Sequence, residues 1–393
     1  MADLPTLPPA PHWWNNERYR GLLYQVALIA FVLGLGWFLV SNTLSNMEKR
    51  HIATGFGFLW REAGFGISEH LIDYSPADNY LHALLVGLLN TIEIGVAGII
   101  LTTLLGIVMG IARLSTNWLV SRLASVYVEA VRNVPLLLQL FFWYALITQL
   151  LPAPRQAFHP LAGIFLSNRG LRLPSLVMDQ AGWGVSLAAV AALAGWLVLG
   201  RWATARRERT GQPFPVMICG IGLMLGLPLL AFAVTGMSLQ LDVPELKGFN
   251  FAGGVTLTPE FVALLLGLVV YTGGFIAEIV RGGIQAVPWG QTEAALSLGL
   301  SRGQTLRLVL LPQALRVIVP PLTSQYLNLT KNSTLAVAIG FPDLVSVGNT
   351  AINQTGQAVE GVAIIMAVYL VISLALSAVM NAYNKRIALR GGR

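Results

Sequence analysis

Charged residues and cysteine are both scarce in this chain. Only 11% of its 393 residues are Asp, Glu, Lys or Arg, whereas 55% are hydrophobic. A soluble domain carries about 25% charged residues, so this composition excludes an ordinary soluble protein and predicts an integral membrane protein. The single cysteine, Cys219, excludes an intrachain disulfide, and its place inside an apolar run is typical of a small buried residue.

Motifs for catalysis are missing as well. The chain has no G-x-x-x-x-G-K-[ST] run to bind nucleotide phosphates and no H-E-x-x-H zinc motif, and its five histidines are scattered. Residues 299–303 match G-x-S-x-G, but a hydrolase needs that motif at a strand-turn-helix, which a short loop between apolar segments does not supply. We therefore predict no catalytic residue, no metal site and no cofactor on this chain.

Eight apolar segments are each about long enough to cross a 30 Å hydrocarbon layer as a helix. They lie near residues 22–40, 81–112, 123–151, 183–200, 216–236, 260–280, 313–334 and 361–383. An open strand would leave backbone groups unsatisfied in lipid, so we predict an all-α membrane protein with about eight transmembrane helices. The first segment could be mistaken for a signal peptide. Its polar leader is long and no small-x-small cleavage site follows Val40, so we predict an uncleaved membrane span.

The basic residues orient these segments. With the N-terminus inside, 16 of the 25 Lys and Arg residues fall in cytoplasmic segments and seven fall outside. Short cytoplasmic loops carry such an excess, so both termini and the 281–312 loop are predicted to be cytoplasmic. The same rule accounts for the net charge of +7, which therefore does not require a nucleic-acid partner.

Small and polar residues inside the segments predict helix contacts. Gly106 and Gly110 form one G-x-x-x-G pair and Gly222 and Gly226 form another, a spacing that permits close helix packing but that also arises because glycine is common in membrane helices. Glu129 and Arg132, three residues apart, favour an ion pair on one helix face over a direct role in substrate binding.

The seventh segment contains the polar group that most resembles a substrate site. Pro320 and Pro321 should break or kink this helix, and transporters often bind substrate at such a break. A free amino acid carries two charges that need partners in a low-dielectric path, which makes Lys331 a candidate for the carboxylate and Glu278 a candidate for the ammonium. Equally supported is a structural role in which Lys331 pairs with a glutamate such as Glu278. The other candidate pathway residues are Gln139, Tyr144, Tyr271, Asn328, Ser333 and Thr334.

The predicted cytoplasmic loop before the seventh segment has the most specific pattern. Residues 293–312 read EAALSLGLSRGQTLRLVLLP, with Glu-Ala-Ala, a glycine four residues after the last alanine, and a proline after an apolar triplet. This pattern resembles the EAA loop of bacterial ABC import permeases. Residues 131–144 (VRNVPLLLQLFFWY), residues 271–343 and Asn90-Thr91-Ile92 resemble the polar-amino-acid subfamily, and the resemblance covers about 81–145 and 260–383.

The resemblance implies a type I importer in the bacterial inner membrane. A periplasmic binding protein would deliver an L-amino acid to a permease dimer, and two copies of an ATPase subunit would bind ATP and Mg²⁺. In such a permease, Glu293, Ala294, Ala295, Gly299 and Pro312 couple to the ATPase. Residues 293–299 would form a short helix in a groove of the ATPase, Gly299 would permit a turn, and Pro312 would set the restart of the next helix.

The extra segments suggest a closer relationship within that subfamily. Long permeases of this kind resemble the general L-amino-acid system, in which two different permease subunits pair, so a heterodimer is expected. The chain then divides into four parts. Residues 1–80 contain the N-terminal leader and the first span, and residues 81–151 form the first part of the permease core. Residues 152–258 are the insert, and residues 259–393 form the second part of the core. An ion-coupled secondary amino acid transporter is the alternative, but it leaves the polar loop unexplained and no clear inverted repeat supports it. A membrane enzyme would need the reactive residues that are absent.

Overall fold

The computed structural model describes residues 17–49, 54–178, 182–212, 214–236 and 239–389. Seven of the described helices are long and apolar enough to cross a membrane, and a bent helix pair makes an eighth candidate if its two arms together form one span. The seven are α1 (Glu17–Lys49), α2 (Tyr80–Arg113), α5 (Gly182–Thr210), α6 (Val216–Thr235), α7 (Pro259–Gln285), α10 (Leu311–Asn332) and α12 (Ala358–Leu389). These crossings coincide with the eight predicted segments, so the predicted helical membrane fold is confirmed.

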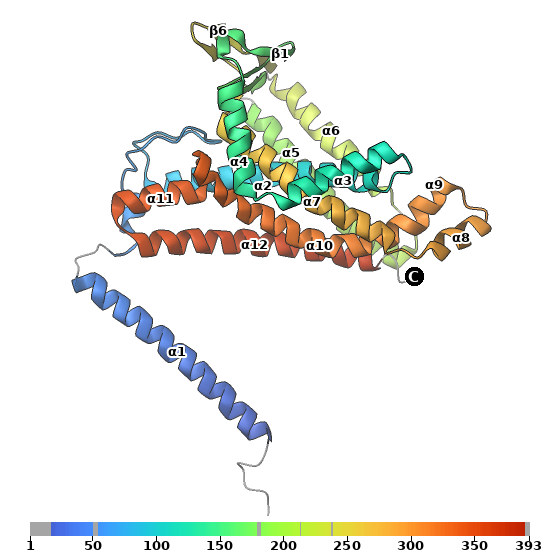
Figure 1. Ribbon diagram of the computed structural model, residues 1–393, viewed down its shortest axis with the longest axis horizontal. Helices are drawn as coiled ribbons and strands as arrows, with labels where there is room; N and C mark the ends of the chain where they lie inside the picture. The colour runs from blue at the N-terminus through green and yellow to red at the C-terminus, as the bar shows by residue number, and fades with distance from the viewer. Residues whose placement is uncertain (1–16, 50–53, 179–181, 213, 237–238, 390–393) are drawn as a thin grey trace, which may run out of the picture. The chain divides into compact units, whose positions relative to one another are not determined.

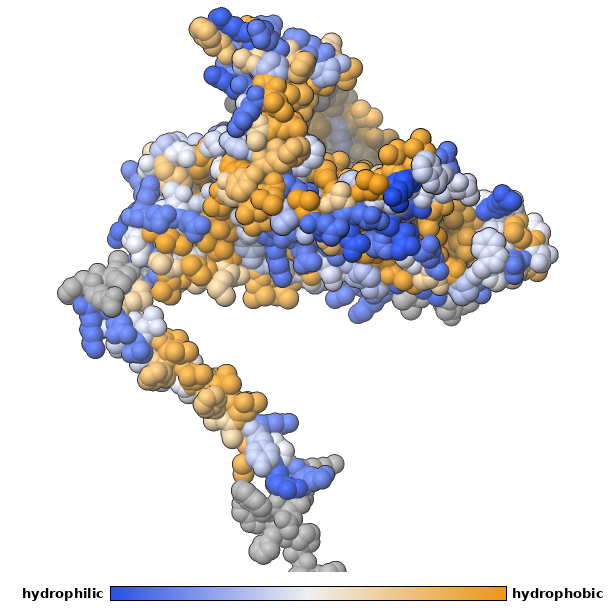
Figure 2. All heavy atoms as spheres, viewed as in Figure 1, coloured by the Kyte–Doolittle hydropathy of each residue, from blue (hydrophilic) through white to orange (hydrophobic). Residues whose placement is uncertain are grey.

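The hydropathy of α1 agrees with a membrane crossing. Figure 2 shows hydrophobic residues along the middle of this helix and hydrophilic residues at both of its ends. The helix has Glu17 in its first turn and Lys49 in its last.

The bent pair corrects the simple picture of the third segment. It consists of α3 (Trp118–Asn133) and α4 (Leu136–Ala145), which is continued by the π-helical turn η3 (Leu146–Leu150), and the two arms are bent by 106°. Pro135 causes the break, because the residue before a proline is pushed out of the helical region; Val134 is extended, with φ −101° and ψ 126°. The crossing over 123–151 is therefore not one continuous helix.

The chain forms two compact units. One comprises the described residues of Met1–Asn90 and Pro342–Leu376, and the other comprises those of Thr91–Phe341 and Ser377–Arg393. The four-part division of the sequence given above follows topology and family resemblance, and it stays a prediction.

In the first unit, the segment before α2 packs on the start of α2 and on α11 (Leu344–Thr355). Phe58, from the 3₁₀ turn η2 (Phe56–Trp60), meets the ring of Tyr80 edge-on, with 5.8 Å between centroids. The Tyr80 hydroxyl donates to Gln354 Oε1 at 2.8 Å, and the Asn90 amide donates to the carbonyls of Glu69 and Pro342 at 2.7 and 2.9 Å. These contacts hold the segment before α2 as a folded cap.

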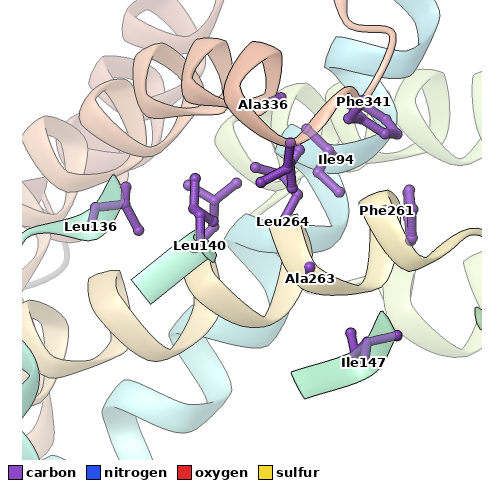
Figure 3. Packing of buried hydrophobic residues seen from close by; sticks show 11 residues of the cluster. Ile94, Leu136, Leu140, Ile147, Phe261, Ala263, Leu264, Ala336 and Phe341 are labelled. Carbon is purple, nitrogen blue, oxygen red and sulfur yellow. The ribbon is translucent and has the colours of Figure 1, made fainter. Parts of the chain in front are cut away.

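The second unit has its core where α4, α7 and the 3₁₀ turn η6 (Ser333–Ile339) meet (Figure 3). The largest fully buried side chains there include Leu140, Leu264 and Phe341. Phe261 and Phe341 lie with ring centroids 6.0 Å apart. This core fixes α7, whose far end leads into the loop with the EAA pattern.

The two G-x-x-x-G pairs behave differently. Gly106 and Gly110 on α2 lie against α7, where a Cβ on Gly110 would come 2.7 Å from the backbone oxygen of Ala277. A Cβ on Gly222 or Gly226 of α6 would meet nothing within 4 Å. The first pair is therefore a helix contact, as the spacing predicted, and the second pair makes no close contact in this chain.

The insert contains short strands that the sequence did not predict. They are β1 (Phe158–Leu161), β2 (Ile164–Ser167), β3 (Gly170–Leu173), β4 (Ser175–Met178), β5 (Leu239–Asp242), β6 (Glu245–Lys247), β7 (Asn250–Ala252) and β8 (Val255–Leu257). β1, β2, β3 and β8 form one antiparallel sheet, β4 pairs with β5, and β6 pairs with β7. Strands before α5 thus pair with strands after α6, and Figure 1 shows β1 and β6 close together.

Candidate functional site

The EAA pattern folds into a helical hairpin made of α8 (Trp289–Ser297) and α9 (Arg302–Thr305), which projects beyond the ends of α7 and α10 (Figure 1). Gly299, at φ +81°, ends α8. The amides of Gly299 and Leu300 donate to the carbonyls of Leu296 and Ala295 at 2.9 and 3.2 Å. A residue with a Cβ resists this left-handed conformation, so glycine permits the sharp turn here.

The next helix begins at Arg302. Ser301 and Gln304 form a capping box in which the Gln304 amide donates to Ser301 Oγ at 3.3 Å and the Ser301 amide donates to Gln304 Oε1 at 2.9 Å. Helical structure then continues through the π-helical turn η5 (Leu306–Leu310) into α10. Pro312 stands in the first turn of α10, where a restart is expected, but helical structure already precedes it from Arg302, so the role of Pro312 stays a prediction.

The surface of α8 combines apolar and acidic groups. Trp289 and Leu298 are 73% and 83% exposed. Ala295 is buried, whereas Glu293 and Ala294 are exposed, and Trp289 Nε1 donates to Glu293 Oε1 at 3.0 Å. Gln313 of α10 donates to Gln291 at 3.3 Å, which ties α8 to the adjoining span. The exposed face therefore offers a small apolar protrusion with one carboxylate, a surface suited to docking in a groove of another protein.

The candidate pathway residues on the third and sixth segments have identifiable partners. Gln139 is buried, and its amide donates to the carbonyls of Val131 and Val134 at 3.0 Å each, across the α3–α4 bend. The Tyr144 hydroxyl donates to Glu260 Oε1 at 3.0 Å. The ring of Tyr271 lies 5.0 Å from that of Phe275, centroid to centroid. The structure thus gives Gln139 a structural role at the bend, and the pathway role of all three residues stays a prediction.

The seventh segment is not broken at its prolines. α10 runs without interruption from Leu311 to Asn332 with Pro320 and Pro321 inside it, so a break at these residues is wrong, whereas a kink there stays a prediction. Two prolines remove only two backbone donors, and the burial of the neighbours Val319 and Leu322 holds the helix in place. A change in helix type comes later, at Ser333.

The polar residues at the end of α10 and at the start of η6 fall into two groups. Asn328 and Lys331 are exposed in this chain. Ser333 is fully buried and donates to the carbonyl of Thr330 at 2.7 Å, while Thr334 donates to that of Lys331 at 2.8 Å. Among the described residues, no ion pair involves Lys331. Asn328 and Lys331 are therefore the members of this group that remain open to a partner or a solute.

Glu278 has two basic partners. Its carboxylate forms ion pairs with Arg113 at the end of α2 and with Arg281 one turn further along α7. Arg113 also reaches Ser125 of α3 at 3.4 Å. The proposed pairing of Glu278 with Lys331 is therefore wrong. The sequence contained Arg113 and Arg281, but it could not show that their helix ends meet.

The expected ion pair on α3 is also absent. Within the described residues, Glu129 and Arg132 are not joined by a salt bridge. The Arg132 guanidinium instead lies 5.1 Å from the ring centroid of Phe275 on α7, and the Asn133 amide donates to the backbone oxygen of Glu129 at 2.7 Å. A tertiary cation–π contact has replaced a local pair, because α7 offers an aromatic face there.

These features define a permease subunit, and comparison with known sequences agrees. Residues 210–389 match the family of binding-protein-dependent transport system inner membrane components. The chain is 49% identical over 374 residues to the general L-amino acid transport system permease protein AapQ of Rhizobium johnstonii, covering 95% of this chain and 94% of that protein. The chain therefore belongs to this permease family.

Two further relatives differ in how much of this chain they match. The glutamate/glutamine/aspartate/asparagine transport system permease protein BztB of Rhodobacter capsulatus is 43% identical over 408 residues, 95% of each chain. The glutamine transport system permease protein GlnP of Escherichia coli is 33% identical over 201 residues, 51% of this chain and 88% of that protein. The shorter permease thus matches about half of this chain.

Family membership fixes the general role. The chain is a multi-pass component of the inner membrane that acts in transport, together with a substrate-binding protein and an ATPase. The comparisons give no support to the ion-coupled alternative.

Proposed function

We propose that this chain forms one half of the translocation pathway of an ABC importer for polar or general L-amino acids. The names of the relatives support the substrate class, because AapQ and BztB both belong to amino acid transport systems. The α8–α9 hairpin supports the coupling role. In this proposal ATP and Mg²⁺ bind to a partner ATPase, and both termini and the hairpin face the cytoplasm.

One observation carries the coupling proposal: a rigid turn presents an exposed, partly apolar helix between two membrane spans. The turn depends on Gly299 at φ +81°, and Trp289 and Leu298 form the protruding surface. If this helix transmits force from the ATPase, its direction relative to α10 must be fixed. The capping box at Ser301 and the Gln291–Gln313 hydrogen bond provide that rigidity.

A matched pair of glycine substitutions tests the proposal. Gly299→Val places a β-branched residue in a left-handed conformation, which costs roughly 1–2 kcal/mol and should reorient α8. Gly303→Val makes the same chemical change four residues away, where φ is ordinary and a Cβ meets nothing within 4 Å. Amino acid uptake and substrate-stimulated ATP hydrolysis by the assembled transporter should fall for the first variant and be retained by the second. Normal coupling in Gly299→Val, with normal membrane insertion, would reject this role.

We further propose that the partner permease is a different chain. Support comes from the resemblance to long permeases of the general L-amino-acid type, in which two permeases pair. Native mass spectrometry of the purified transporter should give one copy of this chain, one copy of a related permease and two copies of the ATPase. A complex with two copies of this chain would contradict the heterodimer and leave the coupling proposal intact.

We propose the exposed face of α10 as this chain's contribution to the substrate pathway. Lys331 and Asn328 lie one turn apart on that face and are exposed at membrane depth, where an uncompensated charge is costly unless it faces a watery path or a partner. Lys331→Met keeps most of the apolar stem and removes the charge. Uptake should drop while assembly is kept; unchanged kinetics for several amino acids would exclude Lys331 from the pathway.

A further inference from the structure

The end of the α5–α6 hairpin carries an uncompensated basic cluster. Arg201, Arg206, Arg207 and Arg209 lie within the last ten residues of α5, and Glu208 is the one acidic residue among those ten. Within the described part of the chain, no salt bridge involves any of these arginines. Basic clusters beside a membrane helix attract anionic lipid headgroups.

A groove leads from this cluster along α5. Its volume is about 1120 Å³, and its wall is mostly apolar until it reaches Arg201 and Thr204. Leu193, Leu197 and Arg201 follow at intervals of four residues, so they share one helix face. The groove borders the contact between the two helices, because Trp196, which packs against Gly220 of α6, also lines it, as does Val216 at the start of α6. The groove thus combines a long apolar wall with a cationic and hydroxyl-bearing end.

Aromatic residues mark the level of this polar end. Trp202 and Phe214 meet edge-on, with 5.2 Å between ring centroids. The Arg206 guanidinium lies 5.4 Å from the centroid of Trp202 and 5.8 Å from that of Phe214. Tryptophan is enriched at the membrane–water interface, so we infer that Arg201, adjacent to Trp202, lies at headgroup depth. Arg206 is engaged with the two rings, which leaves Arg201 as the arginine at the groove.

We propose that this groove binds an anionic phospholipid, with its phosphate at Arg201 and an acyl chain along Leu193 and Leu197. A phospholipid supplies an anion and an apolar chain in one molecule, which matches both ends of the groove. A transmembrane helix of a partner subunit would match the apolar wall but would also need an acidic residue opposite Arg201. The groove lies on α5 and α6 and is separate from the α8–α9 hairpin proposed to couple to the ATPase.

A comparison of two arginines tests the site in the assembled transporter. Delipidated transporter is titrated with phosphatidylglycerol or with phosphatidylethanolamine, and bound lipid is counted by native mass spectrometry. Arg201→Gln should weaken phosphatidylglycerol binding about fivefold, the contribution of one basic residue beside an anionic headgroup. Arg207→Gln removes the same charge from an exposed position outside the groove and should have a much smaller effect. Equal effects of the two substitutions would show diffuse attraction and overturn the proposal.

A second pair of variants tests the apolar wall. Ala194→Trp fills the groove, whereas Val190→Trp adds the same bulk one turn away, at an exposed position that does not line it. The proposal requires loss of phosphatidylglycerol binding in the first variant only, with both complexes intact on size-exclusion chromatography. Binding of phosphatidylglycerol by the isolated chain but not by the assembled transporter would show that a protein subunit covers the groove and would also overturn the proposal.

Discussion

Replacing the glycines of α2 with alanine should loosen its contact with α7. A Cβ on Gly110 would lie 2.7 Å from the backbone oxygen of Ala277 and 2.8 Å from Cβ of Val280, and a Cβ on Gly106 would lie 2.6 Å from Cβ of Ile276. Real Cβ atoms do not approach a backbone oxygen or another Cβ so closely. Alanine at either position therefore forces the two helices apart or shifts the side chains between them.

The expected magnitude follows from two opposing effects. Overpacking a well-packed contact costs about 1–3 kcal/mol. The better helix propensity of alanine returns up to about 1 kcal/mol. For Gly110→Ala, whose nearest neighbour is backbone and cannot rotate away, we expect a net loss of about 1–2 kcal/mol. Gly106→Ala should cost a similar amount, and the double variant should not be additive because the two sites share neighbours.

The chain contains its own control. Gly222 and Gly226 have the same spacing on α6, but a Cβ there meets nothing within 4 Å, so alanine should leave stability unchanged or raise it slightly. Unfolding of the purified transporter by sodium dodecyl sulfate in mixed micelles, followed by tryptophan fluorescence, measures both pairs. If the α2 and α6 variants unfold at the same denaturant fraction, the argument from close approach is refuted.

Three further substitutions probe other contacts. Glu278→Gln leaves Arg113 and Arg281 without their acidic partner and should lower the free energy of unfolding by about 1.5–3 kcal/mol in the same assay. Glu245→Gln, on the exposed strand β6, is the control and should leave that free energy unchanged. Equal effects of the two substitutions would argue against a structural ion pair at Glu278. Gln139→Leu should cost about 1–3 kcal/mol, because two carbonyls at the α3–α4 bend lose their donor, and unchanged stability would mean that they find another. Burial raises the pKa of Asp343 from 3.8 to about 6, so its contribution to the stability of the first unit is full below about pH 4 and is lost as the pH rises through about 6. That loss of stability is on the order of 3 kcal/mol. Asp343→Asn keeps an oxygen that can accept from the amide of Ser346, and it should abolish this part of the pH dependence. If the stability of the variant still falls over the same pH range, another titrating group is responsible.

Local sequence predicts much of the α8–α9 hairpin. A glycine after a short helical run marks the end of α8, and Ser301 followed three residues later by Gln304 is a capping pattern that can be read without a structure. Pro312 shows the limit of that reading, because it stands in the first turn of α10 and yet no break precedes it. A proline is compatible with the beginning of a helix, but it does not require one when a π-helical turn precedes it.

The sequence alone determined which segments enter the membrane, because transfer of an apolar run of about 20 residues depends only on that run and its flanking charges. Tertiary structure decided everything that depends on which helices meet. The two glycine pairs look alike in the sequence, yet only Gly106 and Gly110 face another helix closely. Glu278 pairs with Arg113, 165 residues away, and not with Lys331. Two of the strand pairs of the insert, β3 with β8 and β4 with β5, form across the two intervening spans, so no periodicity within either half could predict these pairings. Such contacts are set by the geometry of the whole unit, and a local pattern cannot specify a partner that lies far away along the chain.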